Sequence, residues 1–264
     1  MYINVHNRTI IFFATLKRQR SSRLRMTSPI RDYDAMTSAV LYTLFPAAAT
    51  VIGAAMALYR RPGAATMRVI HHFTAGIVFA AAATEILPDL KQQSPVAVLL
   101  GGAAGVLLML LVRQLGEKAQ GPVGFIAAVG VDIFIDGLVL GIAFAAGAKA
   151  GLLLTLALTL EVLFLGLSIV GDLKDFLGRR LRAMAAIVGL ALLLPIGGLL
   201  GAPVAMLGAF WLTAFLAFGL IALLYLVTEE LLVEAHEGGK ETPFATAMFF
   251  AGFLLLLLLE EGLG

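Results

Sequence analysis

Long apolar segments alternate with short polar ones along most of the chain. Each apolar segment holds about 20 residues, the length that a helix needs to cross about 30 Å of hydrocarbon. We therefore predict an all-α membrane protein whose transmembrane domain, residues 36–264, is a bundle of eight helices. The predicted spans are 37–59, 69–89, 94–114, 121–146, 150–171, 182–201, 204–228 and 243–263.

The composition agrees with a membrane protein and limits its chemistry. Of the 264 residues 60% are hydrophobic and 14% are charged, whereas soluble domains have about 25% charged residues. The chain has no cysteine, so a metal site must use oxygen ligands or the four histidines. No nucleotide-binding loop, nucleophile–base pair or cofactor motif is visible. We therefore expect no enzyme, no cofactor and no nucleic-acid partner.

The first 35 residues are polar and basic, and we expect them to form a separate tail. Their apolar patch, Thr9–Leu16, is too short to cross a bilayer. Two interpretations stay open. The tail is disordered or acts as a weak amphipathic anchor, or it is an extension that precedes a true start at Met26.

Basic residues in the loops predict the orientation, because cytoplasmic loops carry an excess of Lys and Arg. The loops after the second, fourth and sixth spans contain Lys91 and Lys149. The other loops contain Arg60, Arg61, Arg68, Arg113, Lys118, Lys174, Arg179, Arg180, Arg182 and Lys240. We expect this second set to be cytoplasmic and both termini to lie outside the plasma (inner) membrane, although the basic tail favours the reverse.

Three acidic residues lie inside the fourth and fifth spans, where no Lys or Arg accompanies them: Asp132, Asp136 and Glu161. A charged residue at the centre of a spanning helix costs at least ~2.5–3.5 kcal/mol on insertion scales, so it requires a partner or a function. Asp132 and Asp136 are one helical turn apart on the same face. A short turn at Gly147–Gly151 requires the two spans to pack antiparallel, which can bring Glu161 to the other two acids.

Carboxylate oxygens suit divalent cations such as Mg, Ca, Mn, Fe(II) and Zn, so these three acids are the predicted metal ligands. Carboxyl groups in a low dielectric can instead hold protons, which leaves proton coupling open. The structural alternatives are an aspartate pair at the mouth of a helix and a protonated Glu161 bonded to Thr155 or Thr159.

Several further residues are weaker candidates for metal binding. Each also has a structural interpretation, as an interfacial, boundary or packing side chain. They are Glu85 and Asp89 at the end of the second span, His71 and His72 near its start, and Ser168 on the face of Glu161. The acidic residues after the seventh span form either a solvated face or a cytoplasmic patch for metal release: Glu229, Glu230, Glu234 and Glu237, together with His236.

Glycine and proline residues predict where helices pack closely and where they bend or break. Gly137 and Gly141 form a GxxxG pair that permits close helix contact. Pro88 can kink or end the second span, and the segment Pro195–Gly198 predicts a break in the sixth span.

The residues of the fourth span resemble a motif of the Zrt/Irt-like (ZIP) family of divalent-metal transporters. Asp132–Gly137 is similar to the family pattern His-Asn-x-x-Asp/Glu-Gly, and Glu85–Asp89 is similar to the end of the family's second span. The segment Tyr225–Leu232 resembles the seventh span, so the resemblance covers about residues 36–264. It implies a ZIP-like bundle that works by alternating access, in which the helices that hold the metal move largely as a rigid body.

The fifth span departs from the family pattern. Only Glu161 and Gly166 keep recognisable chemistry, and the family's two metal-binding histidines and its proline are missing. Leu165 stands where the corresponding frame of the fourth span has Asp136. The metal site is therefore expected to be reduced to one oxygen-rich site.

We expect transport of a divalent metal of the Zn, Mn or Fe class through a site between the fourth and fifth spans. The metal is then the transported substrate, and the partners are the lipid bilayer and metal ions, with a homodimer left open. Two alternatives remain. The chain is a divergent ZIP-fold protein that has lost metal transport, or it is a proton-coupled transporter of another solute.

Overall fold

A computed structural model describes residues 29–60, 62–91, 93–118, 121–236 and 242–263. Residues 1–28, most of the expected basic tail, lie outside the described residues, while residues 29–35 belong to the first described helix. Residues 35–264 form one compact unit.

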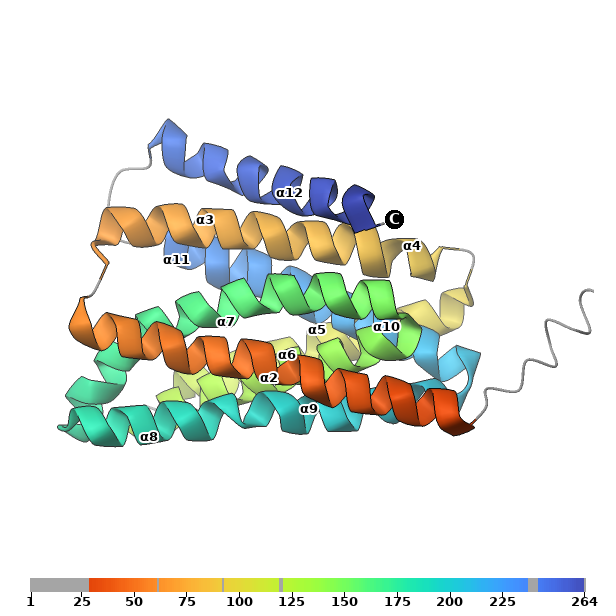
Figure 1. The fold of residues 1–264 in the computed structure, drawn as a ribbon, viewed down its shortest axis with the longest axis horizontal. Coiled ribbons are helices and arrows are strands. Elements are labelled where there is room, and N and C mark those ends of the chain that lie inside the picture. Colours follow the sequence, from red (N-terminus) through yellow and green to blue (C-terminus); the bar gives the residue numbers. More distant parts are fainter. Residues whose placement is uncertain (1–28, 61, 92, 119–120, 237–241, 264) are drawn as a thin grey trace, which may run out of the picture. The chain divides into compact units, whose positions relative to one another are not determined.

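Eight helical segments within the described residues are long and apolar enough to cross a membrane, so the predicted all-α fold class is confirmed. Four of them are single helices: α2 (Pro29–Tyr59), α5 (Pro95–Lys118), α6 (Pro122–Ala146) and α7 (Ala148–Leu177). A fifth single helix, α12 (Pro243–Leu263), packs along α3 (Ala64–Ala81) (Figure 1).

The fourth and fifth spans pack antiparallel, as predicted. α6 ends at Ala146 and α7 begins at Ala148, so Gly147 is the only residue between them. α7 continues past the expected end at residue 171 to Leu177. It ends there because Gly178 adopts a left-handed conformation, with φ of 70°, that closes the helix. The single-residue connection fixes α6 and α7 face to face.

The second and seventh spans each contain a π-helical turn. In the second span, η1 (Ala82–Ile86) lies between α3 and α4 (Leu87–Leu90), and Pro88 does not end the span. In the seventh span, η3 (Leu226–Leu231) joins α10 (Ala209–Tyr225) to α11 (Leu232–His236). Such turns insert an extra residue into a helix and occur frequently at functional sites.

The break expected in the sixth span was wrong in its position. The sixth span is interrupted at Leu192, between α8 (Arg180–Ala191) and α9 (Leu193–Gly201), and not at Pro195–Gly198. Proline disturbs the turn before it, because its ring lacks an N–H and clashes with the carbonyl four residues earlier.

The seventh span begins at Ala209 and not at residue 204. Gly208, with φ of 91°, separates it from the 3₁₀ helix η2 (Ala202–Leu207). The span also continues beyond the expected end at residue 228, because the π-turn η3 carries the helix on to His236.

α6 and α9 pack with their backbones in contact, which confirms the close approach expected from Gly137 and Gly141. A Cβ atom at Gly137 would lie 2.0 Å from the carbonyl oxygen of Leu194, and one at Gly197 would lie 2.2 Å from that of Phe134. Only glycine fits at such distances. This seam fixes the face that α6 turns toward α7.

We expect Gly137→Ala to destabilise the bundle, because the added methyl group must separate α6 from the backbone of α9. Overpacking of this kind typically costs about 1–3 kcal/mol. The matched control is Gly189→Ala on α8, where an added Cβ meets no atom within 4 Å. Thermal unfolding in detergent should show a lower midpoint for Gly137→Ala alone; equal midpoints would contradict the seam.

Candidate metal centre

Three carboxyl groups meet between α6 and α7. Asp132 and Asp136 lie one turn apart on α6, and Glu161 lies on the facing turn of α7. One oxygen atom from each group lies within 4.8 Å of the other two. The side chains of Asp136 and Glu161 are almost fully buried, with 3% and 2% exposed, whereas Asp132 is half-buried. The sequence pattern that places these acids on facing sides therefore corresponds to a compact cluster.

The cluster leaves polar atoms unsatisfied. Oδ2 of Asp136 and Oε2 of Glu161 are buried and have no hydrogen-bond partner among the described residues. A buried acceptor without a partner costs about 1–3 kcal/mol, and more when it is charged. Two such oxygens beside a third carboxyl group are an arrangement that a divalent cation, or shared protons, would stabilise.

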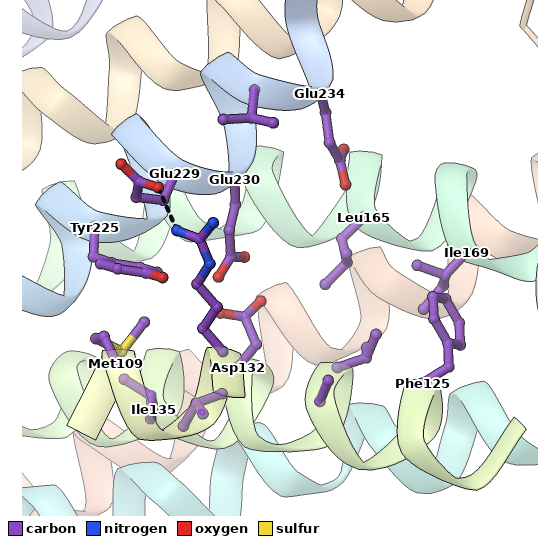
Figure 2. A pocket seen from close by; sticks show the side chains of 15 residues that line it. Met109, Phe125, Asp132, Ile135, Leu165, Ile169, Tyr225, Glu229, Glu230 and Glu234 are labelled. Carbon is purple, nitrogen blue, oxygen red and sulfur yellow. Dashed lines mark hydrogen bonds and ion pairs between the residues drawn. The ribbon is translucent and has the colours of Figure 1, made fainter. Parts of the chain in front are cut away.

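A cavity of about 360 Å³ reaches the edge of this cluster. It lies beside the end of α5 and the first half of α6. Its acidic lining consists of Asp132, Glu229, Glu230 and Glu234 (Figure 2). Solvent in this acidic passage can thus approach Asp132, the one carboxyl group of the cluster that lines it.

Glu230 and Glu234 both line this passage. Glu230 is half-buried on η3 and points toward Asp132 (Figure 2). Its charged neighbours are Asp132, Asp136 and Glu234. The sequence contained a usable signal, because Glu230 and Glu234 are four residues apart and so share one face if the helix continues past residue 228.

Arg113 supplies a positive charge to the same cavity. Its guanidinium donates a hydrogen bond to Oε2 of Glu229 at 2.9 Å, which links α5 to η3 (Figure 2). Both side chains are exposed by about half, at 54% and 43%. An exposed pair of this kind contributes about 0–1 kcal/mol, so it shapes the mouth of the cavity more than it stabilises the fold.

Ser168 and His71 lie together. Nε2 of His71 is 3.5 Å from Oγ of Ser168, and its Nδ1 is 3.3 Å from Oε2 of Glu234. The contact joins α3, α7 and α11 through one buried imidazole. His72 is also buried.

Glu85 and Asp89 do not join the cluster. Glu85 lies on η1, half-buried, and its charged neighbours are Glu260, Lys149 and Asp89. Lys149 and Glu260 form an ion pair at 3.4 Å. Asp89 is exposed and lines a separate cavity of about 210 Å³ beside the start of α10. The structure therefore separates these two acids from Asp132, Asp136 and Glu161.

The fold and this site define a polytopic helical membrane protein with a buried acidic centre that an acidic cavity approaches from one end. No family model matches the chain. It is 32% identical to the zinc transporter ZIPB of Bordetella bronchiseptica over 245 residues, which cover 82% of this chain and 78% of that protein. It is 30% identical to the zinc transporter GufA of Myxococcus xanthus over 150 residues, which cover 56% of this chain and 59% of that protein. The chain belongs to the ZIP family.

Glu161→Met should raise the stability of the metal-free protein, because it replaces a buried carboxyl group with an apolar side chain of similar volume. We expect a gain of about 1–3 kcal/mol in the free energy of unfolding. The control is Glu229→Met at the exposed ion pair, where the change should be small. Thermal unfolding with a chelator measures both, and a lower midpoint for Glu161→Met would indicate that the carboxyl group is already well satisfied.

Proposed function

We propose that this protein transports divalent metal cations of the Zn, Mn or Fe class across a membrane. In this proposal Asp132, Asp136 and Glu161 bind the ion between α6 and α7. The observation that carries it is the convergence of three carboxyl oxygens within 4.8 Å. One oxygen of Asp136 and one of Glu161 are buried and have no hydrogen-bond partner among the described residues. Membership of a family whose named relatives are zinc transporters supports a metal as the substrate.

The oxygen-only ligands bear on the choice of metal. Zn²⁺ accepts carboxylate ligands at about 2.0–2.2 Å, but it also favours nitrogen and sulfur. Mn²⁺ and Fe²⁺ tolerate a ligand set of carboxylates and water. Mg²⁺ keeps several waters and is less suited to a site this buried. Zn, Mn and Fe(II) are therefore the candidate substrates, with little to separate them.

Alternating access is the mechanism that we infer. The acidic cavity gives a hydrated ion access to Asp132 in this conformation. Close backbone contacts join α6 to α9, and α7 to α2, where a Cβ at Gly166 would lie 2.2 Å from the carbonyl oxygen of Thr50. Helices held this tightly would move together and carry the acids with them.

For the orientation we keep the expectation from the basic loops. The cavity lies at the end of the bundle that carries Arg113 and the other basic loops, so it would open to the cytoplasm. Both termini would then lie outside the plasma membrane. In this orientation Glu230 and Glu234 would attract an ion that leaves the site.

Asp136→Ala and Glu161→Ala should each abolish uptake of Zn²⁺, Mn²⁺ or Fe²⁺ into proteoliposomes, because each removes a ligand from a three-ligand site. The matched control is Asp172→Ala, an exposed acid on the same helix as Glu161. Uptake should persist in the control. Unchanged uptake in the two site variants would overturn the site, and no uptake by the wild type of any of these metals would favour a chain that has lost transport.

Leu165→Glu should strengthen metal binding. Leu165 lines the cavity with Asp132, so a carboxylate there would add a fourth acidic ligand. More ligand charge generally tightens a site, and we expect the dissociation constant to fall about tenfold. Isothermal titration with Mn²⁺ measures the change. A weaker or unchanged affinity would mean that residue 165 does not reach the ion.

A further inference from the structure

Two histidines from different helices lie side by side at the end of the bundle that holds the acidic cavity. His72 is on α3 and His236 is on α11, and these two helices pack together. The centres of their rings are 5.3 Å apart and the ring planes are inclined by 49°. His72 is buried, whereas His236 is exposed. The pair is therefore accessible from the His236 side.

Both imidazoles are held in the same way. Nδ1 of His72 donates a hydrogen bond to the carbonyl oxygen of Arg68 at 2.9 Å, one turn earlier on its helix. Nδ1 of His236 donates to the carbonyl oxygen of Leu232, again one turn earlier. Because a carbonyl can only accept, each Nδ1 carries a proton, and in the neutral form of either ring the lone pair lies on Nε2. Metal-binding histidines are typically oriented by such a bond to the other ring nitrogen.

The spacing of the rings fits a shared ion. Two imidazoles that bind one tetrahedral metal through nitrogens at about 2.0–2.1 Å have ring centres about 5 Å apart. Simple packing of two aromatic rings allows the same separation, but it does not require both Nδ1 atoms to be fixed on backbone carbonyls. The ring separation and the two Nδ1 hydrogen bonds to backbone carbonyls together are typical of a preorganised bis-imidazole site.

Contacts beside the histidine pair fix the position of α3 relative to α11. The adjacent His71 contacts Glu234 of α11 at 3.3 Å and Ser168 of α7 at 3.5 Å. A second cavity, of about 390 Å³, borders His236 together with Thr228 and Leu232, which leaves room for water as further ligands. Glu234 also lines the acidic cavity, so the two regions adjoin.

We propose that His72 and His236 form a second metal site, which binds a borderline divalent ion such as Zn²⁺, Ni²⁺ or Cu²⁺ through two Nε2 atoms and water. The site differs in chemistry from the carboxylate cluster, because imidazole selects these ions over Mn²⁺ and Mg²⁺. It does not depend on transport through Asp136 and Glu161. An ion here bridges α3 to α11 beside the mouth of the acidic cavity.

Cu²⁺ is a suitable probe, because among first-row divalent ions it generally binds such ligands most tightly. The experiment uses tag-free full-length protein with His6→Asn, so that the N-terminal histidine cannot contribute. Electron paramagnetic resonance at one Cu²⁺ per chain should show splitting from two nitrogens. The splitting should disappear in His236→Asn and persist in Thr228→Ala, a neighbour on the same cavity.

A double variant, Asp136→Ala with Glu161→Ala, separates this site from the acidic centre. The nitrogen splitting should persist in it, even when metal uptake is lost. Splitting that is absent from the starting protein, or that survives His236→Asn unchanged, would overturn the proposal. Because His236 is exposed, its replacement is not expected to disturb folding, which circular dichroism checks in each variant.

Discussion

The cost of burying three carboxyl groups in a low-dielectric interior is the constraint on which the rest of the structure depends. Asp136 and Glu161 are nearly inaccessible, and each has a buried oxygen without a hydrogen-bond partner among the described residues. No lysine or arginine occurs in the sequence of α6, and the two lysines of α7 lie near its ends. The negative charge of such a cluster must be neutralised. A cation or protons taken up from solvent can do this.

The helix packing serves this cluster. One residue, Gly147, joins α6 to α7, and glycine seams hold each helix against a neighbour at backbone contact. Tight seams fix the rotation of both helices, so their acids stay aimed at each other despite the unfavourable charge. The π-turn η3 then brings Glu230 over Asp132, which extends the acidic surface from the cluster to the cavity mouth (Figure 2).

Periodicity and span length were enough to predict the eight helices and the meeting of the three acids, because a 20-residue apolar segment and a one-turn spacing have few structural solutions. The π-turns could not be predicted, since nothing in a local pattern distinguishes an extra residue from an ordinary turn. That is why the seventh span was expected to end at residue 228 and Glu230 was placed beyond the span. The contacts of His71 with Glu234, and of His72 with His236, join distant segments and required the tertiary structure.

The most direct test of the central claim is the metal content of the purified protein at the acidic centre alone. His72→Asn and His236→Asn remove the second site, and Mn²⁺, which favours oxygen ligands, serves as the probe. The account predicts close to one tightly held Mn²⁺ per folded chain, lost on Asp136→Ala and on Glu161→Ala. A folded protein that holds no Mn²⁺, or that holds as much after either replacement, would contradict it and leave the carboxyl groups as a proton-binding site.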